Sequence, residues 1–73
     1  MVRLANISGK KAARASEKAG WRVAGQVGSH RVLIKDGLRT NLSVPQHKEL
    51  APGTLRALIR HSGLTVDEFL ALL

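Results

Sequence analysis

Three histidines, His30, His47 and His61, are the side chains in this 73-residue sequence best suited to acid–base chemistry. The ordinary pKa of an imidazole lies near 6.5, so the ring can take up and release protons near neutral pH. The three histidines follow no metal-site spacing. The sequence has no cysteine, which excludes disulfides, thiolate metal sites and a cysteine nucleophile. We therefore expect neither a metal ion nor a cofactor.

The other reactive side chains point to no familiar catalytic arrangement. Asp36 fits a hairpin turn, and Asp67 and Glu68 fit a helix start, so a pair of catalytic carboxylates has little support. No serine stands in the strand–turn–helix setting of a nucleophile elbow. One histidine among basic residues is sufficient for cleavage of RNA through its own 2′-hydroxyl, because the substrate supplies the nucleophile. From composition alone this is one hypothesis among several, since a lone histidine is more often structural.

The charge is strongly basic and unevenly distributed. Twelve Lys and Arg against five Asp and Glu give a net charge of +7. Residues 1–31 hold seven basic residues and one acid, whereas residues 32–73 hold five basic residues and four acids. Such a field attracts a polyanion. Nucleic acid fits better than a membrane, because the basic helix described next has only alanines on its apolar face. No run reaches the length of a membrane span and no apolar signal stretch follows Met1, so we expect a cytoplasmic protein.

The N-terminal third predicts a helix with small side chains on its inward face and a basic ridge on the other. Ser8 can cap a helix over residues 9–19 that Gly20 closes. Alanines and Ser16 form the inward stripe. The ridge on the opposite side comprises Lys10, Lys11, Arg14 and Lys18. It either binds phosphates or serves as a solubilising face, and the sequence leaves both open.

Three strands are expected next, over residues 21–27, 30–35 and 40–44. Gly28-Ser29 and Asp36-Gly37 provide the turns of an antiparallel meander. The inward side chains are predicted to be Trp21, Val23, Val27, Leu42 and Val44. For the second strand we prefer Val32 and Ile34 inward, with His30 at the sheet margin; Leu33 inward is the alternative.

Two helices complete a single domain over residues 1–73. Pro52 suits the first position of a helix that Gly63 stops. A capping box from Thr65 to Glu68 begins a short helix over residues 66–72. The fold class is therefore α+β: a two-layer α-β-β-β-α domain with a three-stranded antiparallel sheet and a short C-terminal helix.

A set of short motifs, in order along nearly the whole chain, resembles the HicA (YcfA-like) toxin family. The motifs are Ile7-Ser8-Gly9-Lys10, Gly20 before an aromatic residue, Gly28-Ser29-His30, Val44-Pro45-Gln46-His47, Glu49-Leu50, Pro52-Gly53-Thr54-Leu55-Arg56, Ile59-Arg60, Gly63-Leu64 and Glu68-Phe69. The sequence departs from many members in having Arg31 and Val32 after the histidine and a short second hairpin. These departures leave the substrate preference open.

The resemblance implies a fold similar to a double-stranded-RNA-binding domain and the activity of an endoribonuclease toxin that cuts mRNA. It implies that His30 is the catalytic histidine and that a HicB-type antitoxin covers the active surface. We expect the reaction to be metal-independent. The residues expected to contact the substrate are Gly28, Ser29, Lys10, Lys11, Arg14 and Arg31. The oligomeric state of the free toxin is not predicted.

Plainer roles remain for several of these residues. Gly28 and Ser29 can simply form the turn, His47 can be a solvent-exposed loop residue, and His61 can complement the dipole at a helix C-terminus. The alternative function is a non-catalytic RNA-binding module of the double-stranded-RNA-binding type. Such modules carry a cluster of lysines at the start of the last main helix. The corresponding helix here begins Pro52-Gly53-Thr54-Leu55, without lysine, which favours the toxin over the RNA-binding module.

Overall fold

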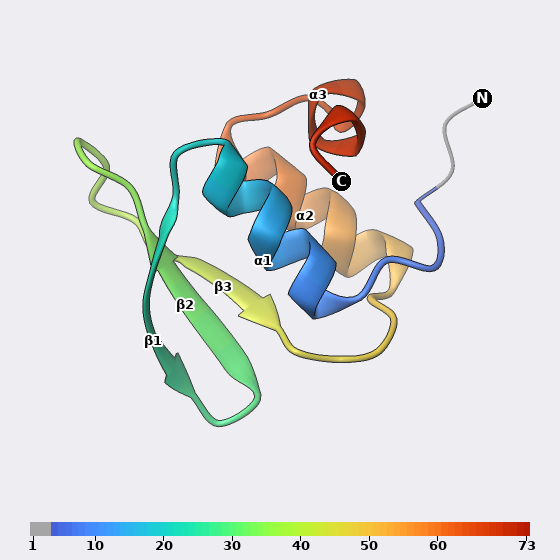
Figure 1. Ribbon diagram of the computed structural model, residues 1–73, viewed down its shortest axis with the longest axis horizontal. Helices are drawn as coiled ribbons and strands as arrows, with labels where there is room; N and C mark the ends of the chain where they lie inside the picture. Colours follow the sequence, from blue (N-terminus) through green and yellow to red (C-terminus); the bar gives the residue numbers. More distant parts are fainter. Residues whose placement is uncertain (1–3) are drawn as a thin grey trace.

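The computed structural model describes residues 4–73 and contains the expected succession of elements (Figure 1). They are α1 (Gly9–Lys18), β1 (Arg22–Val27), β2 (His30–Ile34), β3 (Leu42–Pro45), α2 (Pro52–Ser62) and α3 (Val66–Ala71). The strands form one antiparallel sheet in the order β1-β2-β3. This confirms the predicted α+β, double-stranded-RNA-binding-domain-like architecture. Arg3 and the stretch after Met1 lie outside the described residues.

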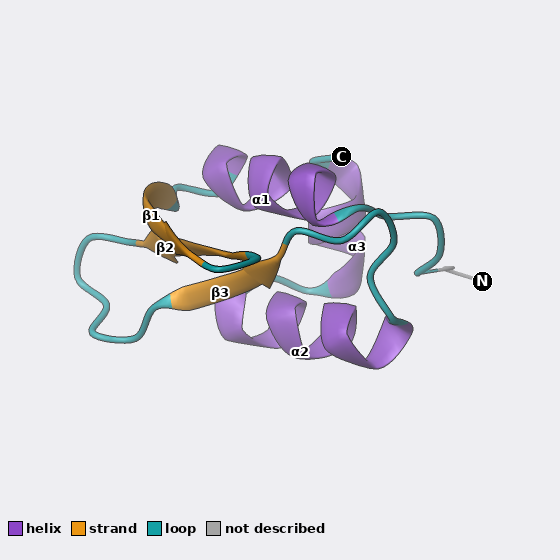
Figure 2. Cartoon of the chain, turned by 90° about the horizontal axis from the view of Figure 1, so that it is seen from below, coloured by secondary structure: helices purple, strands orange, loops and turns teal. Residues whose placement is uncertain are grey.

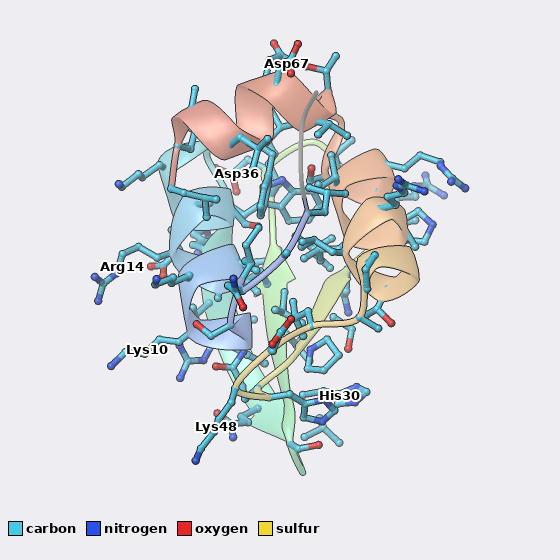
Figure 3. All side chains as sticks on the ribbon, turned by 90° about the vertical axis from the view of Figure 1, so that its right-hand side faces the viewer. Lys10, Arg14, His30, Asp36, Lys48 and Asp67 are labelled. Atoms are coloured by element: carbon cyan, nitrogen blue, oxygen red, sulfur yellow. The ribbon has the colours of Figure 1, made fainter. Side chains whose placement is uncertain are left out.

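The helices gather around one end of the sheet. Both α1 and α2 contact β3, and Figure 2 shows them on either side of that strand. α3 contacts both helices and lies across their ends in Figure 3. None of the helices in residues 4–73 combines the length and hydropathy needed to cross a membrane.

Local signals determine where the helices begin and end. The Ser8 hydroxyl accepts a hydrogen bond from the Lys11 amide at 3.1 Å, and the predicted capping box of Thr65 and Glu68 is present. Gly63 ends α2 with φ at +84°. The stripe of α1 that faces the core consists of small side chains, which lets the helix lie close to the sheet: Ala12, Ala13, Ala15 and Ser16 are fully buried.

The core is centred between the helices and the inner face of the sheet. Its largest fully buried side chain is Phe69 of α3. Trp21, as predicted, is also in the core, and its indole N–H donates to the Ser62 carbonyl at 3.3 Å. The hydrogen bond satisfies a polar group that burial would otherwise leave unpaired.

The preferred register of the second strand was wrong. Leu33 is fully buried, whereas Val32 and Ile34 are only half-buried on the other face. Leu33 lies directly opposite Leu42, and directly opposed residues of antiparallel strands share a face. Burial of Leu42, which the sequence predicted, therefore brings Leu33 inward and sends His30 to the outer face.

The predicted inward position of Val27 was also wrong, because β1 contains an irregularity, whereas Val23 is on the inward face as predicted. The pairing with β2 shifts between Val23 and Gly25, so that Val23 lies opposite Leu33 and Val27 opposite His30. One extra residue in a strand reverses the faces of everything beyond it. Val27 is consequently on the outer face and 73% exposed, while Val23, at the sheet edge, is 44% exposed.

The second connection is longer than a two-residue hairpin. The Asp36-Gly37 turn is present, since the Leu38 amide donates to the Lys35 carbonyl at 3.1 Å and Gly37 has φ at +86°. However, β2 ends at Ile34 and β3 begins only at Leu42, and the intervening loop projects from the sheet (Figure 1).

Candidate active site

The hairpin turn between β1 and β2 positions His30. Gly28, the first of the two turn residues, has φ at +60°, which a glycine adopts without steric cost and which typifies type II′ hairpin turns. A Cβ added there would meet nothing within 4 Å, so the backbone conformation is the reason for a glycine at this position. The side-chain Nε2 of Gln26 donates to the Gly28 carbonyl at 3.1 Å and holds the turn from within.

The end of β3 holds the same turn from the other side. The Gln46 amide donates to the Ser29 carbonyl at 2.7 Å, and His30 lies opposite Pro45 in the sheet. The residues of the Gly28-Ser29-His30 motif are therefore fixed by both neighbouring segments. A site on such a rigid element holds its reactive group in one geometry.

The His30 side chain is exposed and has one polar partner, Ser43 of β3. The Ser43 hydroxyl lies 3.2 Å from Nδ1 of the imidazole. When Nδ1 carries the proton and donates to the hydroxyl, Nε2 holds the lone pair that a general base needs. The pair thus provides an accessible imidazole with a means of fixing its orientation and tautomer.

Ser43 was not identified from the sequence. It is an outward residue of a predicted strand, a position at which serine is common. Only the pairing of β2 with β3, in which Ser43 lies opposite Val32, brings it diagonally next to His30. The alternative register with Leu33 inward could have indicated it, because that register puts His30 on the same outer face as Ser43.

A close backbone approach fixes the start of α1 at this end of the sheet. The Gly9 amide donates to the His47 carbonyl at 2.9 Å. A Cβ on Gly9 would lie 1.9 Å from the Pro45 carbonyl oxygen, so only glycine fits. The first turn of α1 and the loop after β3 therefore have fixed positions relative to His30. Figure 3 shows Lys10, Lys48 and His30 at one end of the molecule, with Asp67 at the other.

Comparison with known protein families identifies the family of this chain. Residues 9–64 match the family model described as "HicA toxin of bacterial toxin-antitoxin". The chain belongs to the HicA toxin family. The match runs from Gly9 through the His30 hairpin to the residue after Gly63, and so includes every element of the candidate site. It gives this HicA protein the role of a toxin whose partner is an antitoxin. A comparison with curated proteins found no significant match.

The other substrate-contact residues predicted for this HicA protein lie at different distances from the imidazole. Gly28 and Ser29 adjoin His30 in the turn. Arg31 is half-buried on the opposite face of β2, paired with Gln26 and Val44. Lys11 and Arg14 line a separate groove between the N-terminal segment and α3, which does not include His30.

The ridge of α1 is exposed, and the one carboxylate of the helix, Glu17, forms no ion pair with it. Across residues 4–73, the one ion pair joins Arg22 to Asp36 at 3.1 Å, so none of the four ridge cations has an acidic partner there. Lys18 donates instead to the Leu72 carbonyl at 3.1 Å. Nor do the described residues bring together three or more side chains of the kinds that hold a metal ion. The site of this HicA protein thus offers an imidazole, a hydroxyl and positive charge.

Proposed function

We propose that this HicA family member is an endoribonuclease that cuts mRNA with His30 as the catalytic residue and without a metal ion. The observation that carries the proposal is the exposed imidazole of His30, fixed on a rigid turn and oriented by Ser43. The matching family supports the toxin role, and RNA cleavage is an activity by which such a chain can act as a toxin.

The chemistry requires one proton to be removed and one to be supplied. Nε2 of His30 takes the proton from the ribose 2′-hydroxyl, and the 2′-oxygen attacks the adjacent phosphorus. The bond from phosphorus to the 5′-oxygen breaks, and that oxygen takes up a proton. The products are a 2′,3′-cyclic phosphate and a 5′-hydroxyl. DNA lacks the 2′-hydroxyl and is not cut.

Positive charge around His30 binds the substrate and offsets the charge that develops on phosphorus. Lys10 lies at the same end of the molecule as His30 (Figure 3). Gly28 and Ser29 present the backbone of the turn beside the imidazole. Lys11 and Arg14 line a separate groove and Arg31 lies on the opposite face of β2, so these three would contact phosphates along the strand rather than the one that is cut.

The partner we propose is a HicB-type antitoxin that covers His30. A protein that cuts cellular mRNA must be masked, and a chain with a charge of +7 favours an acidic partner. With mRNA as substrate and such a partner, we propose that the reaction takes place in the cytoplasm.

The test compares His30→Ala with His47→Ala, which removes an exposed imidazole from the neighbouring loop. Each purified protein is incubated with a defined RNA in EDTA, and each gene is induced without the antitoxin. We expect wild type and His47→Ala to cut RNA and arrest growth, and His30→Ala to do neither while still binding RNA. Binding without cleavage by the wild-type protein would instead support the non-catalytic RNA-binding module.

A further inference from the structure

A groove runs from His30 along the outer side of β3 to α2. It has a volume of about 380 Å³, within the range of small-ligand sites. His30 and Ser43 line one part of it, and Asn41, Thr54 and His61 supply its other polar side chains. None of these three has been given a role in the proposed reaction.

The lining of the groove combines an apolar surface with a few polar groups. Pro45, Ala57 and Leu58 contribute the apolar part, which suits the flat face of a base. The Asn41 amide offers both a donor and an acceptor, and the Thr54 hydroxyl offers the same. These are the complements of the donors and acceptors on the edges of an unpaired nucleobase.

His61 extends the groove at the end of α2. Its side chain is exposed and lines a second small hollow with Thr40 and Asn41, next to the groove. An imidazole N–H there can donate to a phosphate or to a base. The sequence predicted only a structural role for His61 at the helix C-terminus, and its place beside Asn41 follows from the packing of α2 against β3.

We propose that this groove binds the unpaired nucleotide adjoining the phosphodiester that His30 cuts, and that Asn41 and His61 select the base. The inference rests on the proposed function, since RNA is chosen over a peptide because the groove is continuous with the catalytic imidazole. A strand with its phosphate at His30 can place the base of a neighbouring nucleotide in this groove, against Pro45, Ala57 and Leu58. The groove therefore sets the preference for the sequence that is cut.

The first test needs no catalysis. Each of the four nucleoside 3′-monophosphates is titrated into the ¹⁵N-labelled full-length protein, and backbone and side-chain amide resonances are followed by NMR. We expect saturable shifts at Asn41, Thr54 and Ala57, with different affinities for different bases. Saturable shifts confined to the α1 ridge, or no shifts at all, would overturn the assignment.

The second test measures cleavage of RNAs that differ only in the nucleotides beside the cut. Asn41→Ala and His61→Ala each remove an exposed side chain, so they should leave the fold intact. Loss of one neutral hydrogen bond costs about 1 kcal/mol, which corresponds to a rise in KM of about fivefold for the preferred RNA. We expect kcat to change much less and the preference between RNAs to flatten.

Arg56→Ala is the matched control, since Arg56 lies on α2 but lines a different surface, with Ile59 and Arg60. It should keep both KM and the preference between RNAs. If the wild-type protein cuts RNA but Asn41→Ala and His61→Ala keep its KM and preference, the groove assignment is wrong and the role of His30 stands. If the wild-type protein cuts no RNA, the proposed function fails, and the NMR titration with nucleoside 3′-monophosphates alone shows whether the groove binds a nucleotide.

Discussion

The most specific structural claim about the site is that Gly9 fixes the start of α1 against the end of β3, and Gly9→Ala tests it. The added Cβ would lie 1.9 Å from the Pro45 carbonyl oxygen, against the 3.4 Å at which ordinary contact begins. The obstacle is backbone, so it cannot rotate away. Separating the two segments also strains the hydrogen bond from the Gly9 amide to the His47 carbonyl.

We expect the free energy of unfolding to fall by about 2 kcal/mol, the middle of the range for overpacking. For a domain of this size, that change lowers Tm by about 8–16 °C. Circular dichroism during thermal unfolding, together with urea titration, measures it.

Gly53→Ala is the matched control. Gly53 lies in the first turn of α2, and a Cβ there meets nothing within 4 Å. Alanine should leave Tm unchanged or raise it slightly, because it lowers the entropy of the unfolded chain. A Tm for Gly9→Ala within 2 °C of the wild type (roughly 0.5 kcal/mol or less by the same scale) would refute the close approach.

Three further predictions concern the core, the last helix and the basic ridge. Leu33→Ala should lower the free energy of unfolding by about 2–5 kcal/mol, whereas Val27→Thr should change it by no more than about 0.5 kcal/mol. If urea unfolding shows the larger loss for Val27→Thr, the register of β2 is wrong. Thr65→Ala removes the capping box and should lower the free energy of unfolding by about 1 kcal/mol, measured by urea unfolding. An unchanged unfolding midpoint would mean that the box adds no stability. Replacing Lys10 and Arg14 by Gln should lower the salt dependence of RNA binding by about 0.7 in log–log slope for each phosphate that the ridge no longer neutralises, while an unchanged slope would make the ridge a solubilising face.

The parts of the fold that were predicted correctly depend on neighbours in sequence. Ser8, Gly63 and Thr65 end or begin helices through bonds and backbone angles within a few residues, so their types and spacing were sufficient. Gly28-Ser29 likewise specified its own turn. His30 was chosen among the three histidines through the resemblance of the Gly28-Ser29-His30 motif to the HicA family.

The features that were missed depend on contacts between segments. The shift between Val23 and Gly25 reverses the faces of β1, and the signal that could have indicated it was Gly25, because a glycine inside a strand pattern often marks a bulge. Ser43 meets His30 only after β2 and β3 pair, and Asn41 meets His61 only after α2 packs beside β3. The sequence therefore identified the catalytic candidate but not the residues that surround it.

Replacing the ribose 2′-hydroxyl tests whether that group is the nucleophile in the reaction at His30. After a cut site is mapped in a defined RNA, the same RNA is synthesised with one 2′-deoxy nucleotide immediately 5′ of the cut phosphate. We expect that the wild-type protein in EDTA no longer cuts at that phosphate, and that fragments from unmodified RNA end in a 2′,3′-cyclic phosphate. Cleavage of the modified RNA at the same phosphate and at an undiminished rate would contradict the role of the 2′-hydroxyl as nucleophile.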